Sequence, residues 1–270
     1  MASPTQEIVL ITGGNTGLGF EIAKQLLRDH SNRFYVLIGC RTLSKGETAV
    51  QDLHSQGLTA CEVLHIEVTD DESIAQAAKV VGEKFGRVDV LHVNPSIFIA
   101  DGWQAGIASG DSEMLPAGES LSKSIMHTMS TNAAGAAQTA EAFIPLLQKA
   151  DNARLIFMST GLGSLAITKQ YQGLNKTWPC YSASKAALNM IMLYFWGIYG
   201  KEMRVNACNP GYRGTALNGF GTAAGPNHKP GPIELGARNA VRLTLLGKDG
   251  ESGLVTGWKD EEERWEVTPW

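Results

Sequence analysis

Residues 8–19 of this chain read IVLITGGNTGLG, and this stretch decides the fold. Its first half, Ile8–Thr12, is a short apolar run typical of strands that are buried on both faces of a parallel sheet. The glycines that follow are spaced G-x-x-x-G-x-G, which permits a tight turn and a close approach of backbone N–H groups to a pyrophosphate. Leu18, Ile22 and Leu26 then share one face of an amphipathic segment whose N-terminus would attract phosphate. The stretch predicts a strand, a nucleotide-binding glycine turn and a helix; the alternative is a turn that binds nothing.

Strand and helix patterns alternate along the rest of the chain. This alternation predicts a parallel sheet covered on both faces, with ligands at the carboxyl ends of the strands. We therefore expect an α/β fold: a single-domain, Rossmann-type, doubly wound parallel sheet of about seven strands that occupies residues 1–270. Further strands are expected at 34–39, 62–66, 88–93, 154–158, 204–208 and 254–256, and helices at about 44–56, 70–85, 120–148, 181–199 and 233–246.

Composition excludes several classes of protein. With 270 residues, 43% hydrophobic and 19% charged, the chain can bury an ample core. A net charge of −4 with scattered cations gives no reason to expect a nucleic-acid partner. The longest apolar run, Met190–Ile198, is too short to span a bilayer, so no membrane partner is expected. The four cysteines lack metal spacing, which predicts free thiols, no metal and a cytoplasmic location.

The end of the second predicted strand indicates which nucleotide binds. NAD-preferring sites of this architecture usually have a carboxylate here for the ribose 2′-hydroxyl. No Asp or Glu lies between Asp29 and Glu47, whereas Arg41 ends the strand and Lys45 follows one turn later. Because a guanidinium suits a 2′-phosphate, we predict NADP(H) over NAD(H). The alternative is that both cations are ordinary solvated charges.

Tyr181 and Lys185 form the most informative pair in the second half of the chain. A spacing of four residues puts both side chains on one face of a helix. The Lys185 ammonium would favour the phenolate and lower the pKa of Tyr181. Such a tyrosine could exchange a proton near neutral pH. The alternative is a half-buried Tyr beside a solvated Lys.

Together these motifs give the chain a clear family resemblance. Thr12–Gly19 matches the T-G-x-x-x-G-x-G motif of the short-chain dehydrogenase/reductase superfamily, and Tyr181–Lys185 matches its Y-x-x-x-K motif. Asn132 matches the asparagine of its catalytic tetrad. Pro210-Gly211 and Thr215 match its P-G-x-x-x-T segment. Within the superfamily the chain most resembles the NADPH-dependent carbonyl reductases.

The resemblance implies roles for individual residues. Tyr181 would donate the proton, Lys185 would also bind the nicotinamide ribose, and Asn132 would hold a water that links Lys185 to solvent. The implied cofactor contacts are Gly13, Asn15, Thr16, Gly17, Leu18, Gly19, Arg41, Lys45, Glu67, Val68, Asn94, Pro95, Tyr181, Lys185, Pro210, Gly211 and Thr215.

The chain departs from the family pattern at three places. Thr160, preceded by Ser159, aligns with the serine that bonds the substrate carbonyl, and Ser164 is an outside alternative. The N-N-A-G segment after the fourth strand keeps Asn94, but Ser96 replaces a glycine. Glu67 replaces an aspartate expected to reach the adenine. None of these changes removes the proton donor.

We therefore predict an NADPH-dependent reductase that converts a small-molecule ketone, aldehyde or quinone to an alcohol. One alternative on the same fold is reduction of an imine or activated C=C bond, or a cofactor-assisted cyclisation. Another is a non-catalytic NADP(H)-binding regulator.

The substrate pocket is expected between three segments: residues 97–119, residues 166–180, and a mobile loop at 214–232 that is rich in glycine and proline. The alternative for this loop is a surface segment without a role. One face of the apolar helix that carries Tyr181 is expected to pack on the sheet, and its other face could contact a second subunit. The oligomeric state is left open between a monomer, a homodimer and a homotetramer.

Overall fold

One mixed sheet forms the centre of the molecule. The computed structural model describes residues 2–3, 5–98, 120–170, 179–224 and 229–270. Within these residues, eight strands run in the order β3-β2-β1-β4-β5-β6-β7-β8, and all neighbours are parallel except β7 and β8. The predicted fold class is confirmed, with an antiparallel edge strand that was not predicted. The strands are β1 (Glu7–Thr12), β2 (Phe34–Cys40), β3 (Cys61–His65), β4 (Val90–Val93), β5 (Arg154–Met158), β6 (Arg204–Asn209), β7 (Val255–Lys259) and β8 (Arg264–Val267).

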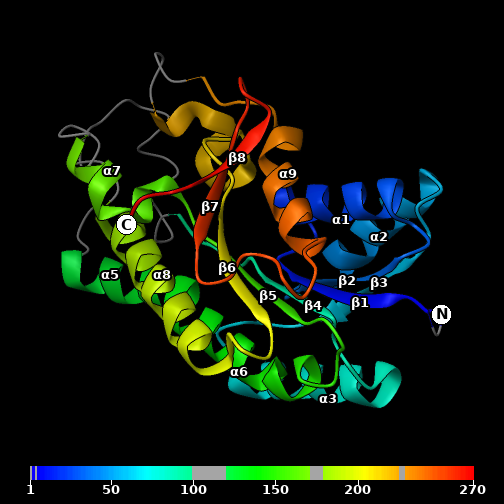
Figure 1. Cartoon of the computed structure of the whole chain (residues 1–270). Helices are drawn as coiled ribbons and strands as arrows, with labels where there is room; N and C mark the ends of the chain where they lie inside the picture. Colours follow the sequence, from blue (N-terminus) through cyan, green and yellow to red (C-terminus); the bar gives the residue numbers. More distant parts are fainter. Residues whose placement is uncertain (1, 4, 99–119, 171–178, 225–228) are drawn as a thin grey trace.

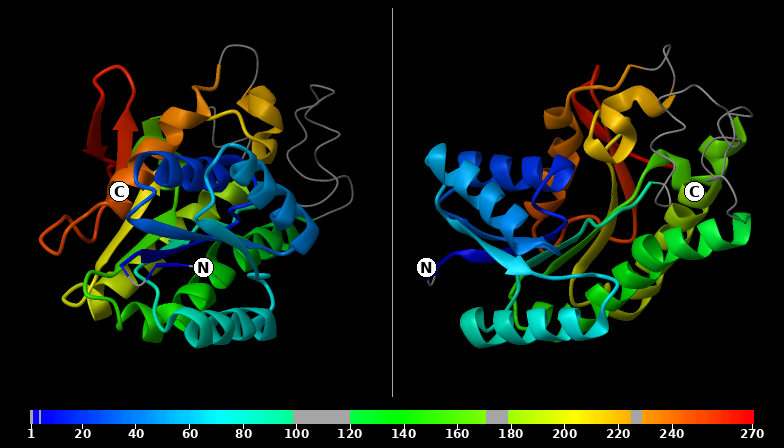
Figure 2. Two further views of the ribbon diagram at one scale, coloured as in Figure 1. Left: turned by 90° about the vertical axis from the view of Figure 1, so that its right-hand side faces the viewer. Right: turned by 180° about the vertical axis from the view of Figure 1, so that it is seen from behind.

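Helices cover both faces of this sheet. Figures 1 and 2 show α1 (Gly17–Asp29), α2 (Leu43–Ser55) and α9 (Ile233–Thr244) on one face. The opposite face carries α3 (Asp71–Phe85), α6 (Ala136–Leu147) and α8 (Pro179–Tyr199). The described residues also form α5 (Leu121–Met129), a π-helix η1 (Ser130–Gly135), α7 (Leu165–Gln170) and the 3₁₀ segments η2 (Gly161–Gly163) and η4 (Ala216–Ala224).

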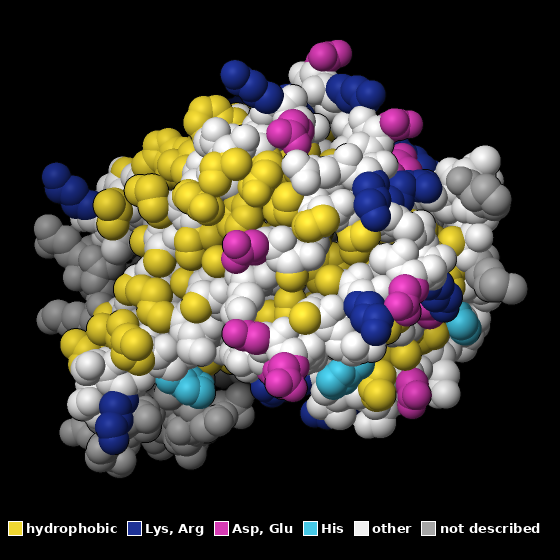
Figure 3. All heavy atoms as spheres, turned by 90° about the horizontal axis from the view of Figure 1, so that it is seen from below, with side chains coloured by type: hydrophobic (Ala, Val, Ile, Leu, Met, Phe, Trp, Pro, Cys, Tyr) yellow, Lys and Arg dark blue, Asp and Glu magenta, His cyan; other side chains and the backbone are white. Residues whose placement is uncertain are grey.

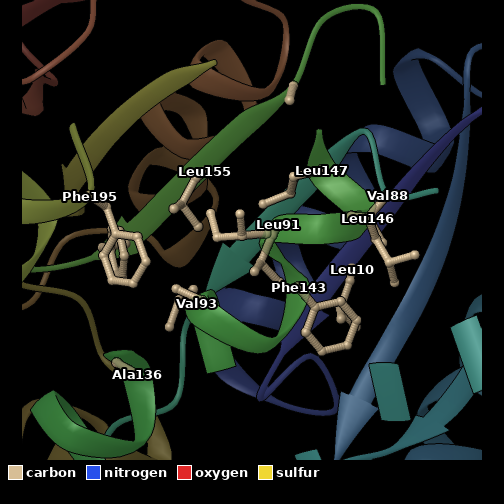
Figure 4. Packing of buried hydrophobic residues seen from close by; sticks show 14 of the residues in the cluster. Leu10, Val88, Leu91, Val93, Ala136, Phe143, Leu146, Leu147, Leu155 and Phe195 are labelled. Atoms are coloured by element: carbon tan, nitrogen blue, oxygen red, sulfur yellow. The ribbon is translucent and has the colours of Figure 1, made fainter. Parts of the chain in front are cut away.

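Two apolar cores result, one on each side of the sheet. Because successive side chains of a strand point to opposite faces, Leu10 of β1 enters one core and Val9 enters the other. Figure 4 shows Leu10 and Leu91 packed near Phe143 of α6 in the core beneath α3, α6 and α8. The second core lies beneath α1, α2 and α9 and includes Ile22. Burial on both faces explains why the central strands read as continuous apolar runs.

The helix of Tyr181 has one buried face and one exposed face. Leu188, Met192 and Phe195 of α8 pack in the core, whereas Met190 and Tyr194 are 67% and 63% exposed. Figure 3 shows hydrophobic side chains gathered on the side of the molecule where α5 and α8 lie. A monomer, a homodimer and a homotetramer all stay open, as they do in the sequence analysis. Among the described residues, no helix combines the length and the apolar character that a membrane crossing requires.

The edge of the sheet at β8 is charged. Trp265 of β8 pairs with Trp258 of β7, and Lys259 lies 3.1 Å from Glu266 and 3.2 Å from Glu262 across and beside the hairpin. The sequence pattern did not predict this strand because two of its four residues, Arg264 and Glu266, are charged and the strand buries little apolar surface.

The glycine turn after β1 packs tightly against β4 and α1. Gly13 and Gly17 have φ values of +63° and +59°, which glycine adopts without strain. A Cβ on Gly19 would lie 2.4 Å from the carbonyl oxygen of Gly13 and 2.7 Å from Nδ2 of Asn94. The turn, the helix and the end of β4 can approach this closely only while residue 19 lacks a side chain.

Gly19→Ala should therefore lower the free energy of unfolding by about 2–3 kcal/mol, because a backbone atom cannot move aside as a side chain can. Gly197→Ala on α8 is the matched control, since a Cβ there meets no atom within 4 Å and alanine favours helices by about 1 kcal/mol. Urea unfolding of both variants measures the difference. Equal stability of the two would contradict the packing described.

Candidate active site

A cleft of about 350 Å³ opens at the carboxyl ends of the parallel strands. Its walls come from the glycine turn, the ends of β2 and β3, the segments that follow β4, β5 and β6, and the first turns of α8. This is where a doubly wound sheet binds its ligands. The predicted site residues in its wall are Gly13, Asn15, Thr16, Gly17, Leu18, Arg41, Lys45, Glu67, Val68, Asn94, Pro95, Ser159, Tyr181, Lys185, Pro210 and Thr215.

Some predicted residues lie outside the wall, and some wall residues were not predicted. Gly19, Gly211, Asn132 and Thr160 do not line the cleft. Ile97, Ala216 and Leu217 of the wall belong to the segments 97–119 and 214–232 that were expected to shape the pocket. Sequence reasoning did not predict the remaining wall residues, which are Cys40, Thr42, Ile66, Ser96, Thr131 and Met158. For Ser96 a signal exists, because serine stands where the resembled family has glycine. The others carry no chemical signature of their own and follow only from their neighbours.

The glycine turn faces the segment after β6 across a narrow part of the cleft. A Cβ on Gly17 would lie 3.8 Å from the side chain of Thr215. The amide of Thr215 donates to Oδ1 of Asn218 at 3.0 Å. Arg213, nearly fully buried, donates to the carbonyl of Pro210 at 2.7 Å and pairs with Asp260 at 2.6 Å. These bonds hold the P-G segment in position beside the turn.

Only part of the predicted mobile loop at 214–232 is described. Its first half forms η4, and Arg213 forms a parallel bridge with Gly231 that brings the two ends of the loop together. Residues 225–228 lie outside the described residues, as do 99–119 and 171–178 of the two other segments expected to shape the substrate pocket.

Two cationic side chains lie at the end of the cleft that is formed by β2 and α2. Arg41 follows β2 and Lys45 lies in the first turn of α2, and both side chains are exposed. Within the described ranges, no carboxylate forms an ion pair with either of them. Their positive charge is therefore available to an anion in the cleft.

Glu67 and Asn94 are already engaged with the protein. Oε1 of Glu67 accepts hydrogen bonds from the amide of Thr69 at 3.2 Å and from its hydroxyl at 2.9 Å. The amide of Asn94 donates to Oγ1 of Thr12 at 2.9 Å, and this hydroxyl donates in turn to the carbonyl of His92 at 3.1 Å. Thr12 thus joins the ends of β1 and β4, which fixes the base of the cleft.

Tyr181 and Lys185 lie on the cleft side of α8, as their spacing predicts. Both are buried in the protein, and Nζ of Lys185 lies 5.7 Å from the centre of the Tyr181 ring. Nζ donates to the carbonyl of Met158 at the end of β5, at 2.8 Å. This bond fixes the ammonium at the floor of the cleft, below the ring of the tyrosine.

The expected lowering of the Tyr181 pKa is not found. Burial raises the pKa of Tyr181 from 10.0 to about 12, an effect only partly opposed by the hydroxyl of Ser96. Burial also lowers the pKa of Lys185 from 10.5 to about 7. The loss of hydration disfavours the charged form of each group. Tyr181 is consequently protonated at neutral pH, which is the form that can donate a proton.

Asn132 lies behind the cleft in the π-helix η1, fully buried. Its side-chain amide accepts from the amide of Ile97 at 2.8 Å and donates to the carbonyl of Ile97 at 2.8 Å and to Oγ of Ser184 at 3.0 Å. The side chain thereby connects the segment after β4 to the helix that carries Tyr181 and Lys185. The water predicted at Asn132 stays a prediction.

The two hydroxyl groups expected to bond the substrate are differently placed. Oγ of Ser159 is buried and donates to Oδ1 of Asn189 at 2.6 Å. Oγ1 of Thr160 accepts from the amide of Leu162 at 3.3 Å and caps η2, outside the cleft wall.

The Ser96 hydroxyl is placed differently from those of Ser159 and Thr160. It lines the cleft, and its hydroxyl faces the phenol of Tyr181 closely enough to affect its ionisation. Oγ of Ser96 is nevertheless buried without a hydrogen-bond partner of ordinary geometry among the described residues. Phe98, two residues on, packs its ring against that of Tyr181 with centroids 4.8 Å apart. The segment after β4 therefore contacts Tyr181 through both Ser96 and Phe98.

Comparison with known proteins agrees with this architecture. The chain matches the model of the short chain dehydrogenase family over residues 7–223, and it belongs to that family. It is 47% identical to the short-chain dehydrogenase/reductase ATR10 of Stachybotrys chlorohalonatus, over 98% of this chain and 94% of that protein. It is 29% identical to salutaridine reductase of Papaver somniferum, over 91% of this chain and 92% of that protein.

Among solved structures, NADPH-bound carbonyl reductase from chicken fatty liver is similar, with a TM-score of 0.76 and 26% identity over 98% of this chain and 99% of that one. The protein is accordingly an oxidoreductase of a family that binds a nicotinamide cofactor.

The residues present fit such a cofactor. Gly13 and Gly17 leave the backbone of the turn open to a pyrophosphate at the start of α1. Arg41 and Lys45 supply positive charge at one end of the cleft, and Lys185 lies at the other. Among the described residues, no cluster of three or more His, Cys, Asp or Glu side chains could hold a metal ion.

The buried Lys185 should make stability depend on pH. Its folded-state pKa of about 7 lies below the unfolded value of 10.5, so burial of the charge costs stability most below pH 7, and this cost fades as the pH rises toward 10.5. Lys185→Met should raise the free energy of unfolding by about 2–4 kcal/mol at pH 7. Urea unfolding from pH 7 to 10 measures the advantage, which should shrink as the pH rises. An advantage that is the same at every pH would contradict the assignment.

Proposed function

We propose that this protein is an NADPH-dependent reductase that converts the carbonyl group of a small molecule to an alcohol. The observation that carries this proposal is the Tyr181–Lys185 pair, which is buried at the inner end of a cleft. The outer end of this cleft holds Arg41 and Lys45, which form no ion pair with any described carboxylate. Reduction needs a neutral acid beside the reacting oxygen, and Tyr181 is neutral at physiological pH. The NADPH-bound carbonyl reductase with the same fold supports the choice of reaction and cofactor.

Preference for the phosphorylated nucleotide follows from Arg41 and Lys45. Both side chains face the cleft at the end of β2, where a 2′-phosphate on the adenosine ribose would lie in a doubly wound fold. Arg41 can bind two phosphate oxygens at once, and Lys45 adds a second positive charge. No carboxylate occupies this part of the described cleft wall except Glu67, which is bonded to Thr69.

The chain's own residues then divide the chemical work. The cofactor, when bound, supplies the hydride that reduces the substrate carbon. Tyr181 donates its phenolic proton to the oxygen that becomes the alkoxide. The Lys185 ammonium stabilises the phenolate that Tyr181 leaves behind, because the two groups are held together by α8 and by the bond from Lys185 to Met158. Asn132 keeps the segment after β4 against α8 and so preserves this geometry.

Reduction of an imine or an activated C=C bond is the second candidate. It is favoured by the position of Thr160, whose hydroxyl lies outside the cleft wall where the family pattern expects a bond to a carbonyl oxygen. NADPH consumption across a panel of ketones, quinones, imines and enones separates the two reactions, and a non-catalytic regulator would consume none.

Tyr181→Phe should reduce turnover of a ketone by about 10²–10⁴-fold, because the variant lacks the phenolic proton and Glu67, a carboxyl group in the described cleft wall, is bonded to Thr69. NADPH affinity, measured by fluorescence titration, should change less than about twofold since the ring is retained. Tyr194→Phe, on the exposed face of α8, is the control and should behave like the wild type. Ketone reduction by Tyr181→Phe at a rate near that of the wild type would refute the assigned role.

Arg41→Asp should weaken binding of NADPH by at least about tenfold, because it removes a bidentate phosphate ligand and adds a repelling charge. Binding of NADH should change far less, since NADH lacks the 2′-phosphate. Lys79→Asp on α3 makes the same change of charge at a surface position and controls for net charge. Dissociation constants from calorimetry decide the matter: an equal loss for both nucleotides would show that Arg41 does not read the phosphate.

A further inference from the structure

An unsatisfied hydroxyl in the cleft points to a further catalytic group. Oγ of Ser96 is buried close to the Tyr181 phenol, yet within the described residues it forms no hydrogen bond of ordinary geometry. A buried hydroxyl without a partner lowers the stability of a folded protein, and native proteins retain few of them. Ser96 lines the cleft beside the Tyr181 phenol, so a ligand in the cleft can provide the missing partner.

The position of Ser96 is fixed by the backbone around it. Asn94, two residues earlier, is held by Thr12, and Ile97, the next residue, is held through both its amide and its carbonyl by Asn132. The intervening Pro95 restricts the backbone further. Ser96 therefore lies on a short segment anchored at both ends, as a preorganised hydrogen-bond donor requires.

The two other hydroxyl groups near this end of the cleft are less suited to the same task. Ser159 donates its proton to Asn189 at 2.6 Å, and Thr160 lies outside the cleft wall. A ligand oxygen next to the Tyr181 phenol would therefore meet the Ser96 hydroxyl first. Besides Tyr181, the group that would donate a second hydrogen bond to this oxygen is then Ser96 after β4, where the resembled family has a glycine, and not a hydroxyl at the end of β5.

We propose that Ser96 is a catalytic residue that hydrogen-bonds the substrate's carbonyl oxygen together with Tyr181. This inference rests on the proposed carbonyl reduction. In that reaction the C=O π bond breaks, the carbon accepts the hydride, and the oxygen accepts the proton of Tyr181. Ser96 keeps its own proton throughout and stabilises the negative charge that develops on the oxygen. Solvent then returns a proton to the Tyr181 phenolate.

Variants at two of the three hydroxyl positions, Ser96 and Thr160, test the proposal. Ser96→Ala should lower kcat for a ketone by about 10–10³-fold, the range found when one donor to a developing oxyanion is removed. The dissociation constant of NADPH should change less than about twofold. Ser96→Thr, which restores the hydroxyl, should recover part of the lost kcat. Thr160→Val should lower kcat less than Ser96→Ala does.

Controls separate a chemical role from a structural one. Ser55→Ala, at the exposed end of α2 away from Lys45, should leave both kcat and thermal stability unchanged. Thermal unfolding of Ser96→Ala should occur at or above the wild-type temperature, because the mutation removes an unsatisfied polar group. A loss of kcat with this stability profile supports catalysis by Ser96.

Three outcomes would overturn the proposal. The first is a wild type that reduces ketones together with a Ser96→Ala variant whose kcat is within twofold of the wild-type value. This result would refute the role of Ser96 and leave the proposed function intact. The second is a larger loss in Thr160→Val than in Ser96→Ala, which would return the donor to the end of β5. The third is a wild type that reduces no member of the carbonyl panel, in which case the proposed function and the role of Ser96 both fail.

Discussion

The close approach of three backbone segments at Gly19, Gly13 and Asn94 is the constraint on which the rest of the site depends. At this point the chain goes from β1 to β2 on one side and later returns to β4 on the other, so the two halves of the sheet diverge. Ligands of doubly wound folds bind where strands diverge in this way. A side chain at residue 19 would push the turn and β4 apart. The glycine turn, Thr12 and the segment that carries Ser96 all take their positions from this contact.

Around that contact the protein buries groups that water would otherwise hydrate. Lys185 donates to the carbonyl of Met158, Tyr181 keeps its proton, and the Ser96 hydroxyl has no hydrogen bond of ordinary geometry with the part of the chain that the structure describes. The burial of Lys185 and of the Ser96 hydroxyl lowers the stability of the folded chain, and both groups face the same cleft as Tyr181. Stability given up at several neighbouring groups is typical of a site whose ligand completes the hydrogen bonding.

The sequence predicts the parts of this structure that depend on local pattern. The buried run Arg154–Met158 is a strand with the predicted bounds, and the spacing of Tyr181 and Lys185 puts both in the cleft as expected. The π-helix was not predicted because it depends on distant packing: a Cβ on Gly135 would lie 2.3 Å from the carbonyl oxygen of Val68. The raised pKa of Tyr181 likewise depends on burial by several elements, which the spacing of two residues does not reveal.

The charged hairpin at the end of the sheet has a consequence for the behaviour of the protein in concentrated solution. An open strand edge offers unpaired N–H and C=O groups to a strand from another molecule, which is a route to aggregation. β8 is only four residues long and carries Arg264 and Glu266, and Lys259 of β7 pairs with Glu266 and with Glu262, which precedes β8. A flat strand from a neighbour would have to approach this row of charges. The edge that closes the sheet thus also discourages its growth into a multi-chain assembly.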